Sequence, residues 1–281
     1  MKILTKLLFI AAVSTPLSTA LAQWLDYPSR DVPRLADGTV DVDAPAPRTA
    51  WGTPDFTGLW EIIPGSIGGD GQSRDSNQPA LPTTASDEPP YATFFDIGAN
   101  IVGGAPYQDW ARSLRDERLA SASRDNPDAH CLPMGHMQLH LHPQPRKIIQ
   151  TEDVIVILYE GNAGVRQIFL DGRRDPDNDP LPWWYGYSWG RWDGDDLVVT
   201  TTHMKDTWLD VNGSPFTENG RIIERFRRPD FGTMIIDVTI DDPTAYSRPF
   251  TVRVQHQVMV DTDLIEFVCL ENEQSSHYYI D

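Results

Sequence analysis

The sequence predicts a mostly β protein whose strands form an antiparallel up-and-down meander that closes into a barrel. From residue 147 onward, apolar runs of strand length follow one another, separated by short turns rich in Gly, Asp and Pro. In the run 234–240, apolar residues alternate with more polar ones, so one face of this strand is dry and the other is wetter. Closing the meander removes the exposed edges that an open sheet would present.

Residues 1–22 have the features of a secretory signal peptide. Lys2 and Lys6 flank the start of an apolar stretch at residues 7–13, and an Ala-x-Ala cleavage site ends at Ala22. The stretch is shorter than the roughly 20 apolar residues that span a bilayer, and no later segment approaches that length. We therefore expect a periplasmic or secreted protein with no membrane insertion.

The chain after the leader divides into an arm and one domain. Residues 23–57 are rich in Pro and Asp and predict an extended N-terminal arm, while residues 58–281 predict a single β-barrel domain. Within it, residues 64–90 hold many Gly, Ser and Pro residues and predict a long mobile loop. Good helix formers with Trp110 and Leu114 four residues apart predict one helix near residues 107–123.

The strands of the meander are expected in order along the chain. The first begins at Gly58-Leu59-Trp60, which resembles the Gly-x-Trp sequence at the start of lipocalins, so a lipocalin-like barrel is expected ahead of an open curved sheet or a sandwich. The Asp193-Gly194 dipeptide marks a tight hairpin. The later runs are residues 153–160, 164–170, 184–192, 195–203, 221–227, 234–240, 250–258 and 264–270.

Four phrases resemble a large group of exported bacterial proteins that has no settled activity. They are PDFTGLW at 54–60, RQIFLDGR at 166–173, GYSWGRWDGDDLVV at 186–199 and ERFRR at 224–228. The chain departs from the usual look of the group at Asp175-Pro176, where His-Pro is common, and at His136-Met137, where Pro-Arg is usual. The resemblance implies export and supplies no mechanism.

The two cysteines and the nearby histidines raise separate possibilities. Export favours a disulfide between Cys131 and Cys269, with a thiolate nucleophile or metal ligand as the alternative. Residues 130–142 contain four His and two Met, and in a strand His140 and His142 would share one face. Their spacing matches no familiar metal motif, so we expect no metal, with His136, His140 and His142 as the weak candidates.

An aromatic row is expected in the strand 184–192 and the residues just before it. In strand alternation one face would carry the side chains of Trp183, Tyr185, Tyr187, Trp189 and Arg191. Such a row can stack on a sugar or an aromatic ligand, or it can pack in the core; the two interpretations stay open. Trp208 and Asp171 complete the set of ligand-binding candidates.

The catalytic candidates are inward-facing titratable groups. Glu224 shares a face with Ile222 and Phe226, His256 lies on the apolar face of the strand 250–258, and Arg166 is a possible partner for a carboxylate. His203 ends the strand 195–203, and Tyr187 is expected to line the same pocket. Convergence of these five side chains would indicate acid/base chemistry, whereas scattered positions would indicate a carrier.

The sequence holds no nucleotide-binding glycine loop, serine-hydrolase elbow, Cys-x-x-Cys or HExxH motif. We therefore expect an exported enzyme of lyase, isomerase or hydrolase type that uses no cofactor and acts on an apolar or aromatic small molecule. The alternatives are a lipocalin-like carrier and a metal-binding periplasmic protein. The formal charge of -18 disfavours binding to nucleic acid, and no pattern indicates an oligomeric state.

Overall fold

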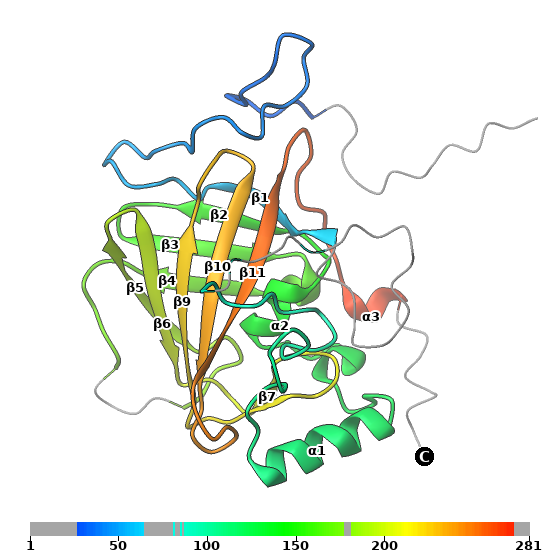
Figure 1. Ribbon diagram of the computed structural model, residues 1–281. Helices are drawn as coiled ribbons and strands as arrows, with labels where there is room; N and C mark the ends of the chain where they lie inside the picture. Colours follow the sequence, from blue (N-terminus) through cyan, green and yellow to red (C-terminus); the bar gives the residue numbers. More distant parts are fainter. Residues whose placement is uncertain (1–26, 65–80, 82–84, 86, 177–180, 273–281) are drawn as a thin grey trace, which may run out of the picture.

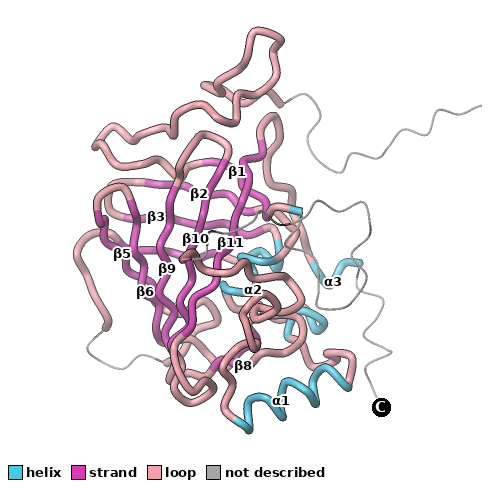
Figure 2. Tube along the Cα trace, in the orientation of Figure 1, coloured by secondary structure: helices cyan, strands magenta, loops and turns pink. Residues whose placement is uncertain are grey.

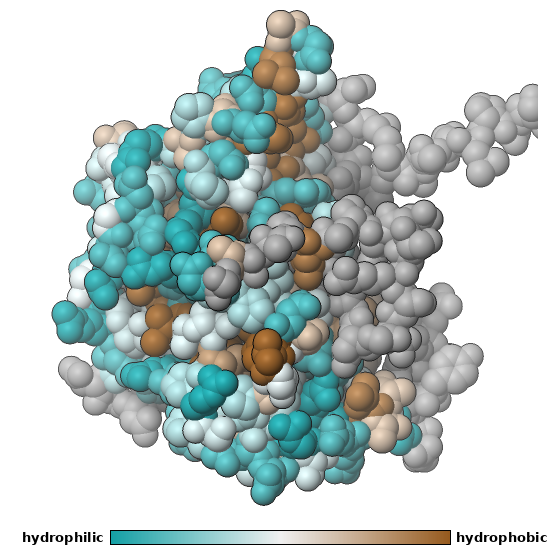
Figure 3. Space-filling view, in the orientation of Figure 1, coloured by the Kyte–Doolittle hydropathy of each residue, from teal (hydrophilic) through white to brown (hydrophobic). Residues whose placement is uncertain are grey.

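The computed structural model describes residues 27–64, 81, 85, 87–176 and 181–272 (Figure 1). The predicted signal peptide and most of the predicted loop 64–90 lie outside these residues. In the described part of the chain, no helix has both the length and the apolar character needed to cross a membrane. The visible surface is mainly hydrophilic, with small separate hydrophobic patches (Figure 3).

Nine strands form a closed barrel in the order β1-β11-β10-β9-β6-β5-β4-β3-β2, which confirms the predicted mostly β barrel. Their bounds are β1 Gly58–Ile62, β2 Arg146–Gln150, β3 Val154–Tyr159, β4 Val165–Phe169, β5 Tyr187–Asp193, β6 Asp196–Thr202, β9 Arg221–Arg227, β10 Thr233–Asp241 and β11 Phe250–Met259. The pairing is antiparallel except between β4 and β5, which run parallel. The expected purely antiparallel meander is therefore wrong at this junction, where the start of β5 pairs in the same direction with the last two residues of β4, Ile168 and Phe169.

Alternation along the strands fills the barrel with apolar side chains. On β10, Met234, Ile236, Val238 and Ile240 are buried, as the sequence pattern predicts. Trp60 on β1 is fully buried, and its indole N–H donates to the carbonyl of Phe56 over 3.0 Å. The same alternation turns the buried polar side chains of Arg166, Ser188, Thr201 and Glu224 toward the inside of the barrel.

Two helices flank this barrel at very different depths. The helix α1, Asp109–Ala120, confirms the predicted helix and lies outside the barrel (Figure 1). The helix α2, His136–Leu141, is labelled in Figure 2. All six of its residues are buried. The expected strand through residues 130–142 is therefore wrong. The preceding Gly135 is extended and leads directly into the helical turn.

The C-terminal run also differs from the expected strand. Residues 260–268 contain no strand, and a short helix α3, Cys269–Asn272, follows. Since β11 already pairs with β1, the closed barrel offers no edge to a further strand. Cys269 is bonded to Cys131 with a Cα–Cα distance of 5.6 Å, which confirms the predicted disulfide.

The arm and a small outer sheet complete the described chain. Residues 27–57 run across one end of the barrel (Figure 1), where Arg34 and Arg48 form ion pairs with Asp261 and Asp195. Two short strands, β7 Thr207–Trp208 and β8 Pro215–Phe216, pair with each other outside the barrel.

Candidate functional site

The centre of the candidate site is an ion pair inside the barrel, between Glu224 of β9 and Arg166 of β4. Both side chains are fully buried, and the guanidinium donates to both carboxylate oxygens. Arg166 also donates to Ser188 Oγ over 3.1 Å and to Thr201 Oγ1 over 2.9 Å. Burial favours the neutral carboxyl, but the positive charge of Arg166 and the hydrogen bonds outweigh it, so the pKa of Glu224 lies well below its usual value.

The helix α2 adds two histidines to this pair. His140 Nε2 lies 2.8 Å from Glu224 Oε1, and His136 Nε2 lies 3.8 Å from Glu224 Oε2. Burial lowers the pKa of both imidazoles, so both are neutral near pH 7. Because an ionised carboxylate only accepts, Nε2 of His140 carries the proton and Nδ1 is the basic nitrogen. Within the described residues, this Nδ1 and both nitrogens of His136 have no hydrogen-bond partner.

A second buried cation fixes the position of α2. Arg146 of β2 donates to the carbonyls of His140 and His142 over 2.8 Å each, at the C-terminal end of the helix. It also contacts His256 Nε2 from β11. Burial lowers the pKa of Arg146 to about 10 and that of His256 well below its usual value. His256 and Arg146 therefore support the helix that carries His140.

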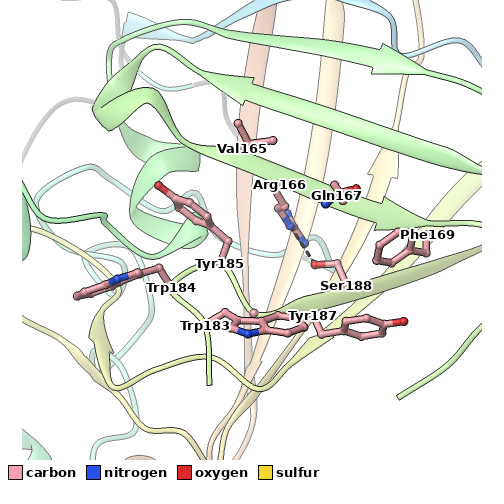
Figure 4. Close-up of a pocket in the computed structure, with 10 residues that line it drawn as sticks. Val165, Arg166, Gln167, Phe169, Trp183, Trp184, Tyr185, Tyr187 and Ser188 are labelled. Atoms are coloured by element: carbon pink, nitrogen blue, oxygen red, sulfur yellow. Dashed lines mark hydrogen bonds between the residues drawn. The ribbon is translucent and has the colours of Figure 1, made fainter. Parts of the chain in front are cut away.

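A surface cavity of about 400 Å³ lies beside this buried network, where β4 and β5 diverge (Figure 4). These parallel strands pair only at Ile168 with Ser188 and at Phe169 with Trp189. Figure 4 shows Arg166 and Ser188 joined by their hydrogen bond in the middle of the cavity lining. The lining residues are Val165, Arg166, Gln167, Phe169, Trp183, Trp184, Tyr185, Gly186, Tyr187 and Ser188.

Three of the five catalytic candidates meet inside the barrel, and two do not. Glu224, Arg166 and His256 belong to the buried network. His203 stands just beyond β6 in a left-handed conformation with φ 55°, which breaks the alternation, and its Nδ1 lies 3.4 Å from Asp175. Tyr187 points outward, because its neighbour Ser188 occupies the inward position. The expected five-residue convergence is therefore limited to three.

The predicted aromatic row is divided between the two sides of the barrel wall. Tyr187 packs between Trp183 and Trp189 on the outer side, with ring centroids 5.9 and 6.1 Å away, and Arg191 is exposed beyond them. Tyr185 departs from the row and stacks on Tyr159 of β3 at 6.3 Å. The reason is Gly186, whose φ of 62° ends strand alternation before β5 begins.

Two further ligand-binding candidates lie away from the cavity. Trp208 is buried in β7 under the guanidinium of Arg118, 4.4 Å from the ring centroid. Asp171 is exposed and forms an ion pair with Arg173. Neither residue lines the cavity between β4 and β5.

The three weak metal candidates do not form one cluster. His136 and His140 face Glu224, while His142, just after α2, lies 3.8 Å from Asp128. Among the residues that the structure describes, no group of three or more His, Cys, Asp or Glu side chains is arranged to hold a metal ion.

Sequence reasoning missed His140 and Arg146 as members of the acid/base network. A usable signal was present, since His136 and His140 are four residues apart, as are Met137 and Leu141, which is the spacing of one helical turn. Comparison with known proteins gives no match to a family model, to a curated protein or to a solved structure. Fold and site geometry therefore carry the functional argument.

Proposed function

We propose that this protein is an exported small-molecule enzyme that uses acid/base catalysis without a cofactor, of lyase, isomerase or hydrolase type. The observation that carries the proposal is the hydrogen bond between His140 and Glu224, which lies beside Arg166, a residue of the cavity lining. A neutral imidazole held by a carboxylate is suited to proton transfer near neutral pH. The predicted leader and the disulfide support export.

In this proposal His140 is the base. Its Nδ1 accepts a proton from the substrate, while Nε2–H stays bonded to Glu224, whose negative charge stabilises the imidazolium that forms. The proton then returns from Nδ1 to another substrate atom, or to the leaving group. Arg166 keeps Glu224 ionised and oriented, with Ser188 and Thr201 holding the guanidinium. His136, 5.9 Å from His140 between ring centroids, is the second neutral imidazole available to the substrate.

The burial of so many ionisable groups favours an enzyme over a carrier. Burying several ionisable groups is costly, because each ion loses several kcal/mol of hydration even after relaxation. A carrier gains little from such groups, whereas proton transfer requires them. The cavity rim of Trp183, Trp184, Tyr185 and Phe169 indicates an apolar or aromatic substrate.

Proton abstraction can be tested before the full reaction is identified. Aryl ketones and aryl esters with acidic C–H bonds are incubated with the protein in D2O, and deuterium in the recovered compound is measured by mass spectrometry. We expect incorporation with the wild type and a loss of about 100-fold or more in His140→Gln, the usual scale for an acid/base group. Binding of these compounds with neither exchange nor turnover would overturn the enzyme proposal.

The alternative is a carrier for an aromatic ligand, which is favoured by the outward cluster of Trp183, Tyr187 and Trp189. Tryptophan fluorescence titrated with the same compounds measures binding. In a carrier, His140→Gln binds as tightly as the wild type and no exchange or turnover is found. In the proposed enzyme, exchange is lost in that variant while binding at the cavity rim remains.

A further inference from the structure

A layer of side chains that includes Arg166 and Tyr185, with Tyr159 behind Tyr185, separates the cavity between β4 and β5 from His140. Two members of the cavity lining, Arg166 and Tyr185, also contact the buried network. The ring of Tyr185 stacks on that of Tyr159, with an interplanar angle of 23°, and the Tyr159 ring lies 6.4 Å from the ring of His140. Access from the cavity to the proposed base therefore requires one of these two side chains to move.

The two side chains are held very differently. Arg166 is fixed by hydrogen bonds to Glu224, Ser188 and Thr201. The hydroxyl of Tyr185 is buried and has no hydrogen-bond partner among the described residues. A buried hydroxyl without a partner is unfavourable, and turning the ring outward returns it to water. Tyr185 is thus the part of the layer that can move at least cost.

The local backbone is built around the inward position of this ring. Tyr185 precedes β5 and is followed by Gly186, so it is not part of the strand ladder of the barrel. A Cβ atom on Gly164 would lie 2.6 Å from the Tyr185 hydroxyl and 3.0 Å from the adjacent ring carbon. Only glycine at position 164 leaves room for Tyr185 to close over Tyr159.

We propose that Tyr185 is a gate, and that a planar aromatic ring of the substrate takes its place on Tyr159 when the gate opens. The proposal rests on the proposed function, because it assumes that His140 is the group to be reached. It also narrows the substrate class to compounds with a ring of about phenyl size, since the space released is that of one tyrosine side chain. Tyr159 then serves as the stacking surface next to the base.

Reaction with diethyl pyrocarbonate tests the gate without a substrate, because this reagent modifies neutral imidazoles and the modified residue is identified by mass spectrometry. We expect Tyr185→Ala to raise the rate at His140 by about tenfold or more, because each 1.4 kcal/mol of lost closure is a factor of ten in the open population. Tyr185→Phe should react more slowly than the wild type, since it removes the buried hydroxyl whose lack of a partner favours the open position. Tyr187→Ala, which changes the same cavity on its outer side, is the matched control and should be unchanged.

Replacement of the ring is tested in the same Tyr185→Ala variant with benzyl alcohol and cyclohexylmethanol, which differ in the planarity of the ring. Benzyl alcohol should restore protection of His140, and cyclohexylmethanol should not. If Tyr185→Ala does not fold, Gly164→Ala carries the test, because its methyl group displaces the ring and should raise the rate in the same direction.

An unchanged rate at His140 in these variants, or an equal rise in Tyr187→Ala, would overturn the gate. Equal protection by both alcohols would overturn the aromatic substrate class. None of these results depends on deuterium exchange, so failure of the gate and failure of the proposed enzyme remain distinguishable.

Discussion

Removing the carboxylate of Glu224 alone should destabilise the protein strongly, and removing its partner as well should reverse most of the loss. Both side chains are fully buried, so Glu224→Leu leaves the Arg166 charge in the interior without its carboxylate partner. Breaking a buried pair in this way costs about 3–5 kcal/mol. The double variant Arg166→Met/Glu224→Leu removes both desolvated charges, and similar replacements are often neutral or stabilising.

Urea unfolding followed by circular dichroism gives the free energy of unfolding for each variant. The matched control is Asp193→Ala, which breaks an exposed pair with Arg225, a residue next to Glu224 on β9. It should change stability by no more than about 1 kcal/mol. A loss below about 1 kcal/mol for Glu224→Leu, or no recovery in the double variant, would refute the argument that this charge is desolvated and paired.

Three further predictions concern other parts of the molecule. Replacing Cys131 and Cys269 by serine should lower stability by up to about 5 kcal/mol from the long loop that they close, and two reactive thiols in the denatured, unreduced wild type would contradict the bond. Burial raises the pKa of Asp210 to about 6, so the folded state binds this proton more tightly than the unfolded state does. This group therefore stabilises the folded state below about pH 4, and the stabilisation is lost as the pH rises through 6. Over this pH range the free energy of unfolding should decline by about 3 kcal/mol less in Asp210→Asn than in the wild type. Parallel pH profiles of the two proteins would contradict this prediction. Elemental analysis should find no stoichiometric metal, whereas about one zinc or copper ion per chain that disappears in the double variant His140→Ala/His142→Ala would show a metal site.

Strand periodicity predicted the inward polar residues where the strands are regular. Glu224 lies between buried Ile222 and Phe226, and Arg166 and His256 each have a buried apolar residue two positions away, so the period of two fixes their direction once one face is known to be dry. The same rule failed for His203 and Tyr185, because a left-handed backbone at His203 and at Gly186 interrupts the alternation. Such local conformations are set by tertiary contacts, and a residue pattern does not report them.

The helix α2 and the absent last strand show a second limit. A helix of six residues is too short to give a clear period, and its stability comes from the burial of all six residues. The run 264–270 has strand-like composition, yet no strand edge remains for it once β1 and β11 have paired. Both outcomes depend on what surrounds the segment in space.

The pairing of β1 has a consequence for the order in which the chain folds. Trp60 on β1 lies opposite Val258 on β11, so the barrel closes only after nearly the whole described chain has been synthesised. Until then β1 lacks one of its two neighbours. Folds dominated by such distant pairings fold in milliseconds to seconds, orders of magnitude more slowly than helical bundles. The side chains of Glu224, Arg166 and His256 therefore come together only once these distant strands have paired.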